Sequence, residues 1–264
     1  MITLDTFREE LERVRTHSPL VVCITNHVVM EFTADALLSI GARPFMSESL
    51  EEIEQAVFKA DALLVNTGTL NPEQEELSKR AVKVARRCNV PWVLDPVGAG
   101  FTSYRMLFNC GLIENCRPTL IKGNASEIAA LCSKTLTAKG TESSLSTDDV
   151  KSEAESLASR NGCIVALSGR KDLITDGIET VEILNGSSKL RGISGAGCIL
   201  GAIAAAFLSK SGSPKDSVVS AFLLECIAAE VAERNFTGYG SFKRALLDEL
   251  SHPCPQQYFN LIEQ

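Results

Sequence analysis

Short apolar runs that end in polar residues recur along the first two thirds of this chain. Four of them have the nearly continuous apolar pattern of strands buried on both faces of a sheet: Pro19–Ile24, Ala62–Val65, Pro91–Leu94 and Thr119–Ile121. Segments with helical periodicity separate these strands. Four strand–helix units in a row predict a doubly wound, mostly parallel sheet flanked by helices on both faces, formed by a single domain over residues 1–264.

The remaining pattern extends this architecture. Helical periodicity and caps predict helices over Leu4–Arg15, Glu31–Ile40, Ser49–Lys59, Asn71–Cys88, Ser103–Glu114, Asp148–Arg160, Pro214–Arg234 and Ser241–Leu250. A fifth buried strand is expected at Cys163–Leu167, followed by a hairpin whose strands are Leu173–Thr175 and Thr180–Leu184. Residues 135–147 are rich in Thr, Ser, Gly and Lys, which predicts a mobile loop. Residues 42–46 form a short segment without an assigned element.

The stretch Ile193–Ser209 is apolar on every side and opens with small residues, Ser194 to Cys198. This pattern predicts a buried helix whose first turn lies at the edge of a loop. A glycine-rich helix start leaves free backbone N–H groups, which suit an anion and above all a phosphate. The alternative is a packed core helix with a glycine-rich entry, and the stretch alone does not choose between them.

Polar residues follow each of the four predicted strands. Asn26 follows the first strand, Gly68 lies just past the second, Asp95 follows the third, and Lys122 begins the series after the fourth. In open parallel sheets the carboxyl ends of the strands meet along one edge, where ligands bind. We therefore expect these residues to gather there, although Asn26 is also typical of a simple backbone turn.

Composition and charge narrow the class of protein. The chain carries 26 Lys and Arg against 33 Asp and Glu, a net charge of −7, which argues against nucleic-acid or anionic-membrane partners. The N-terminus lacks a signal-peptide pattern, and the longest apolar run is too short for a membrane span. Nine cysteines without a CxxC pair indicate reduced thiols in a cytoplasmic protein, and three histidines make a histidine-based metal site improbable.

The candidate chemistry is phosphoryl transfer. A P-loop is absent, and the glycine spacing that begins at Gly195 does not fit the dinucleotide fingerprint. What remains is a glycine-rich helix start, two carboxylates (Asp95 and Glu127) and one cation, Lys122. Carboxylates that hold hydrated Mg²⁺ near phosphates, together with a cation, suit that reaction. Each residue also has a structural explanation, as a turn former, a helix first-turn charge and a solvated strand-end charge respectively.

Six segments carry a resemblance to a known family. In chain order they are TNHVVMEFTADALLSIGARPFMSES, LLVNTGTL, VLDPVGAG, IKGNASEIAAL, SGRKDLITDG and ISGAGCILGAIAAAF. Together they resemble the hydroxyethylthiazole kinase family, ribokinase-like enzymes of thiamine biosynthesis and salvage. The resemblance runs from Ser18 to Phe242, and the N-terminal segment is the most specific part of it.

The resemblance implies an ATP- and Mg²⁺-dependent phosphorylation of the primary alcohol of 4-methyl-5-(2-hydroxyethyl)thiazole. Carried over by position, it implies thiazole contacts from Met46, Asn26, Gly68 and Gly195, ATP contacts from Lys122, Ser168 and Gly197, and a Mg²⁺–phosphate region at Asp95 and Glu127. Cys198 stands where related sugar kinases carry an aspartate base. The resemblance also implies a homotrimer with sites between subunits.

Cys198 has two interpretations. A thiol in the first turn of a helix has its pKa lowered from about 8.5, so a base role is open to it. A small buried hydrophobe is the more common fate of a cysteine. Four residues depart from the family pattern. His27 and Asp35 stand where the family commonly has Asn, Lys122 where it often has Arg, and Ser168 where it commonly has Thr.

Two other classes of protein are compatible with the fold. A nucleotide-dependent dehydratase shares the glycine-rich helix start but carries Asp at the position of Cys198. The second alternative is a nucleotide-binding module without catalysis, and the presence of Asp95, Glu127 and Cys198 weighs against it.

Overall fold

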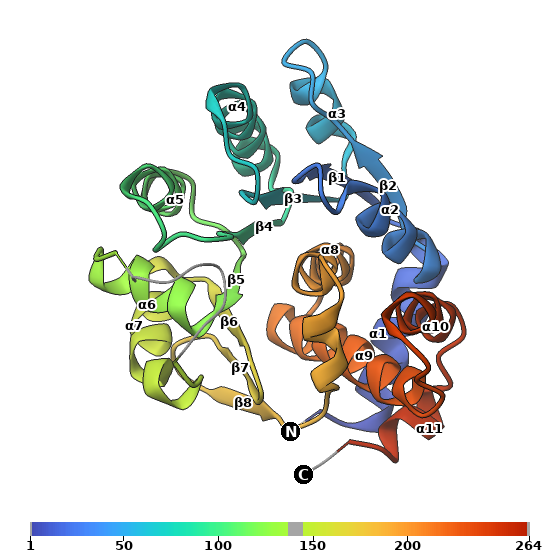
Figure 1. The fold of residues 1–264 in the computed structure, drawn as a ribbon. Helices are drawn as coiled ribbons and strands as arrows, with labels where there is room; N and C mark the ends of the chain where they lie inside the picture. The colour runs from blue at the N-terminus through green and yellow to red at the C-terminus, as the bar shows by residue number, and fades with distance from the viewer. Residues whose placement is uncertain (1, 137–144, 263–264) are drawn as a thin grey trace.

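A single twisted sheet divides the structure into two layers of helices, as Figure 1 shows. The computed structural model describes residues 2–136 and 145–262. In the described residues the sheet has eight strands in the order β2-β1-β3-β4-β5-β6-β7-β8. They are β1 (Leu20–Ile24), β2 (Arg43–Met46), β3 (Ala62–Asn66), β4 (Trp92–Asp95), β5 (Leu120–Asn124), β6 (Ile164–Ser168), β7 (Asp172–Thr175) and β8 (Thr180–Ile183). The first six pair in parallel, and β7 and β8 add an antiparallel hairpin.

Helices cover both faces of this sheet (Figure 1). One layer contains α1 (Leu4–His17), α2 (Met30–Ser39), α8 (Ala196–Leu208), α9 (Pro214–Glu233), α10 (Tyr239–Ser251) and α11 (Pro255–Phe259). The other contains α3 (Ile53–Lys59), α4 (Pro72–Cys88), α5 (Ser103–Cys116), α6 (Ala125–Ser133) and α7 (Lys151–Asn161). Two short 3₁₀ helices are η1 (Asp148–Val150) and η2 (Ser188–Gly192). None of the helices in the described part of the chain is both long and apolar enough to cross a bilayer.

The strands supply both cores because successive side chains point to opposite faces. In β1, Val21 and Cys23 pack into the core under α8, whereas Val22 and Ile24 pack into the core under α3 and α4. All four side chains are buried. Burial on both faces explains the continuous apolar runs of these strands. Helix α8 is buried along its length after the first turn, as its all-round apolar sequence predicts.

The predicted fold class is confirmed, with three local corrections. Residues Arg43–Met46 form the edge strand β2, which the sequence left unassigned. Helix α3 begins at Ile53 rather than at Ser49, and β5 continues to Asn124. The mobile loop predicted over residues 135–147 falls largely on residues 137–144, which lie outside the described residues.

Candidate active site

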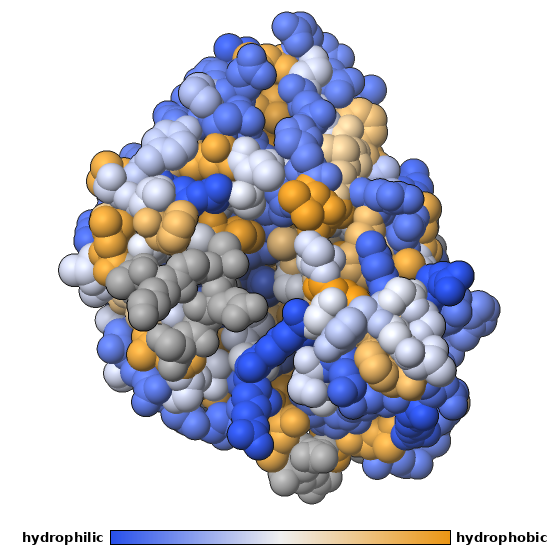
Figure 2. Space-filling view, viewed as in Figure 1, coloured by the Kyte–Doolittle hydropathy of each residue, from blue (hydrophilic) through white to orange (hydrophobic). Residues whose placement is uncertain are grey.

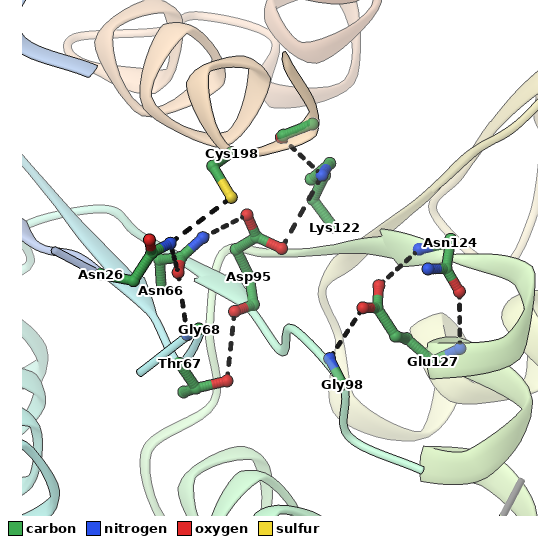
Figure 3. Close-up of polar contacts among 11 residues, drawn as sticks. Asn26, Asn66, Thr67, Gly68, Asp95, Gly98, Lys122, Asn124, Glu127 and Cys198 are labelled. Atoms are coloured by element: carbon green, nitrogen blue, oxygen red, sulfur yellow. Dashed lines mark hydrogen bonds and ion pairs between the residues drawn. The ribbon is translucent and has the colours of Figure 1, made fainter. Parts of the chain in front are cut away.

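Two asparagines and an aspartate join the carboxyl ends of β1, β3 and β4 (Figure 3). The Asn26 Nδ2 group donates to Asn66 Oδ1 at 2.9 Å, and Asn66 Nδ2 donates to Asp95 Oδ2 at 2.7 Å. Asn66 and Asp95 face each other in the β3–β4 register, so the parallel pairing itself brings them together. All three side chains are buried. The predicted gathering of polar residues at this edge is therefore confirmed.

The first turn of α8 lies against the same residues. Asn26 Nδ2 also contacts Cys198 Sγ at 3.6 Å, and Lys122 Nζ donates to the Gly197 carbonyl at 2.6 Å (Figure 3). The Lys122 ammonium lies 3.7 Å from Asp95 Oδ1. The contacts thus form a closed path that leaves α8 at Cys198, crosses the ends of the strands, and returns to α8 at Gly197.

Gly195 starts α8 in a conformation that requires glycine. Its φ is +91°, in the left-handed region that side chains rarely adopt. A Cβ at this position would lie 2.4 Å from Val29 Cγ1. The backbone after Gly195 then presents the exposed Gly197 and the partly exposed Cys198 at the edge of the sheet, with the free N–H groups of a helix start. The arrangement is suited to an anion.

Asp95 and Lys122 form a buried ion pair. Their side chains are 1% and 5% exposed, so the alternative that Lys122 is a solvated strand-end charge is wrong. Burial raises the pKa of Asp95, whereas Lys122 and the Asn66 amide oppose that rise. Burial lowers the pKa of Lys122, but the surrounding acids, with Asp95 first, raise it above its ordinary value. Lys122 therefore stays charged at neutral pH.

The thiol of Cys198 is neutral in this environment. Burial, with the neighbouring Asp95 carboxylate, raises its pKa to about 11, although Lys122 and the two asparagines oppose the rise. The expectation that the helix start lowers this pKa is wrong, because desolvation and a nearby negative charge outweigh the dipole of one helical turn. The thiol can accept and donate weak hydrogen bonds, but little thiolate is present near pH 7.

Glu127 fastens the ends of β4 and β5 together. Oε1 accepts the Gly98 N–H and Oε2 accepts the Asn124 N–H, both at 2.8 Å, while Asn124 Oδ1 caps the helix through the Glu127 N–H (Figure 3). The first-turn role that the sequence offered as a structural alternative is thus real. Burial and the Asp95 carboxylate raise the pKa of Glu127 to about 7. A cation beside it would favour the ionised form.

Asp95 and Glu127 fit a hydrated Mg²⁺ ion, which needs few ligands from the protein. Among the described residues no group of three or more His, Cys, Asp or Glu side chains could enclose a metal ion. Mg²⁺ in phosphoryl-transfer sites usually keeps several waters and is held by one or two carboxylates together with substrate phosphates. Asp95 and Glu127 match that donor set, because both lie at the same edge and each retains acceptor capacity on its oxygens.

The predicted thiazole residues lie at the β1–β3 side of the edge. Gly68 follows β3, and a Cβ there would lie 2.6 Å from Asn26 Nδ2. A glycine at this position therefore lets the Asn26 side chain pack against the backbone of residue 68. Met46 ends the edge strand β2, pairs with Cys23 of β1, and packs against the core on the α8 side. His27 is exposed, with Nδ1 3.2 Å from Glu48 Oε1. The structure therefore groups Asn26, Gly68 and Met46 on one side.

The predicted ATP residues lie on the other side. Ser168 ends β6, is opposite Asn124 in the β5–β6 register, and is partly exposed. It is two strands away from Asp95 in the sheet order. Gly197 is exposed at the start of α8. Figure 2 shows that the surface is hollowed near the centre of the face seen in Figure 1.

Two residues that hold this edge were not among the predicted site residues. Asn66 is the centre of the contact path, and its Oδ1 also accepts the Gly68 N–H at 3.0 Å. Arg105, in the first turn of α5, donates to the carbonyls of Thr67, Gly68 and Val97. The polar end of β3 was visible in the sequence, but no local signal pairs Arg105 with distant carbonyls.

A cavity of about 500 Å³ lies elsewhere, between α4 and α5. Leu107, Phe108 and Tyr104 are among the residues that line it, and none of the predicted site residues does. The chemistry-bearing groups lie at the strand edge, so we assign the candidate site there.

The chain is similar to known proteins over almost its whole length. A hydroxyethylthiazole kinase of Staphylococcus epidermidis is 41% identical over 257 residues, which cover 96% of this chain and 98% of that protein. The solved hydroxyethylthiazole kinase protein of Pyrococcus horikoshii superposes with a TM-score of 0.90 at 33% identity, covering 98% of both chains. A ribokinase-like protein of Enterococcus faecalis, at 12% identity and a TM-score of 0.68 over 97% of this chain and 95% of that one, shares the fold. The sequence profile of the Hydroxyethylthiazole kinase family matches residues 11–255, and the chain belongs to that family of kinases.

Proposed function

We propose that this protein transfers the terminal phosphoryl group of ATP to the primary alcohol of 4-methyl-5-(2-hydroxyethyl)thiazole, which gives the thiazole phosphate used in thiamine synthesis. The observation that carries the proposal is the closed path of contacts from Cys198 through Asn26, Asn66, Asp95 and Lys122 to Gly197. It fixes the start of α8 beside the substrate edge. Family membership supplies the substrate class.

The thiazole would lie on the β1–β3 side, against Asn26, Gly68 and Met46, with its hydroxyethyl arm at Gly195. Cys198 is then the side chain nearest to the attacking hydroxyl. Because its thiol is neutral near pH 7, Cys198 orients the alcohol rather than removing its proton at the outset. Phosphoryl transfer depends mainly on positioning and charge stabilisation, so the reaction does not need a strong base.

ATP would approach from the β6 side, with Ser168 contacting the nucleotide and the N–H groups around Gly197 donating hydrogen bonds to phosphate oxygens. The Lys122 charge lies directly behind this helix start. Asp95 and Glu127 would hold Mg²⁺ through its water shell. The ion neutralises charge on the phosphates when bound.

The same reasoning extends to assembly and location. We propose that residues 1–264 form one domain, that the protein is a cytoplasmic homotrimer, and that its sites lie between subunits, as the family resemblance implies. Free thiols support an intracellular location, since all nine cysteines, each in the described part of the chain, are unpaired. The acidic net charge of −7 supports a small-molecule substrate rather than nucleic acid or membrane.

A substrate panel tests the proposal. Purified protein with ATP and Mg²⁺ should release ADP with the thiazole alcohol and much less with a pyrimidine alcohol, pyridoxal or a sugar. Turnover of one of those alcohols in place of the thiazole would overturn it. Cys198 favours the kinase over the nucleotide-dependent dehydratase alternative, which has Asp at that position, and nucleotide-dependent loss of water without phosphorylation of the thiazole alcohol would favour the dehydratase.

A further inference from the structure

The turn between β6 and β7 follows directly on the candidate nucleotide residue Ser168. Ser168 ends β6, Gly169 is exposed, and β7 begins at Asp172, so the chain reverses within three residues at the edge of the sheet. Figure 1 shows β6 and β7 side by side, with α7 on the left-hand face of the sheet and α9 on the right-hand face. The pairing of β6 with β5 sets the position of Ser168 opposite Asn124, so this turn determines where the backbone from Gly169 to Lys171 lies beside Ser168.

A buried carboxylate holds the turn from below. Asp172 is 6% exposed, and its Oδ1 accepts the Gly169 N–H at 2.8 Å. Its Oδ2 accepts the Cys226 thiol of α9 at 3.4 Å. Burial raises the pKa of Asp172 to about 6, against the opposing effect of these two donors, so the group is an ionised acceptor at neutral pH. One side chain thus ties the turn to the core helix layer.

A second buried side chain holds the other end of the turn. Thr147 is 5% exposed, and its Oγ1 donates to the Lys171 carbonyl at 2.8 Å. A Cβ on Gly169 would lie 2.8 Å from Thr147 Cγ2, so the turn also packs closely against this threonine. The turn is therefore fixed at both of its ends.

The turn between β7 and β8, at the other end of β7, shows that closing a turn does not require a buried charge. Asp176 accepts the N–H groups of Ile178 and Glu179 at 2.9 and 2.8 Å. Its carboxylate is one-third exposed and pairs with Lys215. Burying a carboxylate is costly, and Asp176 avoids most of that cost. The carboxylate at the site end of β7, Asp172, is buried, whereas the one at the far end, Asp176, is not. This difference indicates that Asp172 has a role beyond closing its turn.

We propose that Asp172, together with Thr147, is a positioning residue for the nucleotide. The two side chains fix the turn of residues 168–171 so that Ser168 and the backbone of Gly169 meet the bound nucleotide without further ordering. The inference rests on the proposed function, because it takes ATP as the phosphoryl donor. Holding the turn in place before binding reduces the entropy lost when ATP binds.

Four variants test this proposal: Asp172→Ala, Asp172→Asn, Thr147→Val and the control Asp176→Ala. Asp172→Ala should raise the KM for ATP at least fivefold and weaken direct ATP binding in calorimetry by a similar factor, while the KM for the thiazole changes less than twofold. Asp172→Asn keeps an acceptor oxygen for Gly169 and should restore most of the ATP affinity. Thr147→Val keeps the side-chain volume and should show the same selective rise.

The control separates positioning from hairpin stability. Asp176→Ala removes the same kind of turn bond at the far end, so it should lower the Tm while leaving the KM for ATP within twofold. The proposal is overturned if Asp172→Ala and Thr147→Val both bind ATP like the wild type, or if Asp176→Ala weakens ATP binding equally. Wild-type protein that binds ATP but does not phosphorylate the thiazole would refute the proposed function alone, since calorimetry still measures the effect of each variant.

Discussion

Glu225 of α9 is a buried acid that the proposed reaction does not use. Its side chain is 3% exposed, and Oε1 has no hydrogen-bond partner among the described residues. Burial raises its pKa from 4.5 to about 8, with Lys122 opposing that rise and Asp172 adding to it. Glu225 therefore carries a proton in the folded protein at pH 7, whereas the unfolded chain has already released it.

The sign and size of the effect on stability follow from this difference. Between pH 4.5 and pH 8 the folded state binds more protons than the unfolded state, so the free energy of unfolding falls as the pH rises. The slope due to one such group is about 1.4 kcal/mol per pH unit. The loss over the whole interval is on the order of 5 kcal/mol, and above pH 8 the group adds no further slope.

Glu225→Gln removes this titration while keeping the shape of the neutral side chain. The difference in unfolding free energy between variant and wild type should therefore grow in favour of the variant by about 1.4 kcal/mol per pH unit from pH 5 to pH 8, and then level off. Urea unfolding at pH 5, 6, 7, 8 and 9 measures it. The slope of the difference is the test, because a buried amide changes the offset at every pH alike.

Glu12→Gln is the matched control, since Glu12 is an exposed carboxylate on α1 that water surrounds in both states. The unfolding free energies of this variant and the wild type should differ by a nearly constant amount across the series. A difference for Glu225→Gln that is equally flat from pH 5 to pH 8 would refute the reasoning, because it would mean that Glu225 ionises in the folded protein as it does in the unfolded chain.

Three further predictions concern the site. Asn66→Ala leaves two buried partners unsatisfied and should lower the urea-unfolding free energy by roughly 2–5 kcal/mol; a loss below about 1 kcal/mol would contradict the contact path. Gly195→Ala forces a Cβ against Val29 at positive φ, so a stability loss of about 1–3 kcal/mol and a raised KM for the thiazole are expected, whereas unchanged kinetics would remove Gly195 from the substrate arm. Cys198→Ala should lower kcat by about tenfold or more with the KM for ATP within twofold, and wild-type turnover would return Cys198 to plain packing.

The sequence predicted most of the fold because the buried strands are apolar at nearly every position. The edge strand β2 was missed for a physical reason. Its residues Arg43–Met46 alternate between exposed and partly buried, and Pro44 is compatible with an edge position only. A four-residue strand paired on one side has too little apolar pattern to be distinguished from a loop. The start of α3 was misplaced because Ser49 resembles a cap, whereas the helix begins at Ile53.

The site was predicted less completely, because its decisive features are contacts between distant elements. Strand-end positions alone located Asp95 and Glu127 at one edge. Local sequence does not show that Lys122 is buried against Asp95, which is why a solvated charge remained an alternative. The prediction of a lowered pKa for Cys198 was wrong for the same reason. The sequence shows the helix start, but it does not show the desolvation of the thiol or the neighbouring Asp95 carboxylate.

Lys122, at a position where the family resemblance often implies an arginine, fits its surroundings in this structure. Its ammonium lies beside one carboxylate oxygen of Asp95 and donates to one carbonyl, that of Gly197 in the first turn of α8. A Cβ on Gly197 would lie 3.3 Å from Lys122 Nζ, so α8 approaches this ammonium closely. A planar guanidinium is larger and would make two parallel bonds. The lysine therefore suits a closed contact path in which the start of α8 is held through the Gly197 carbonyl.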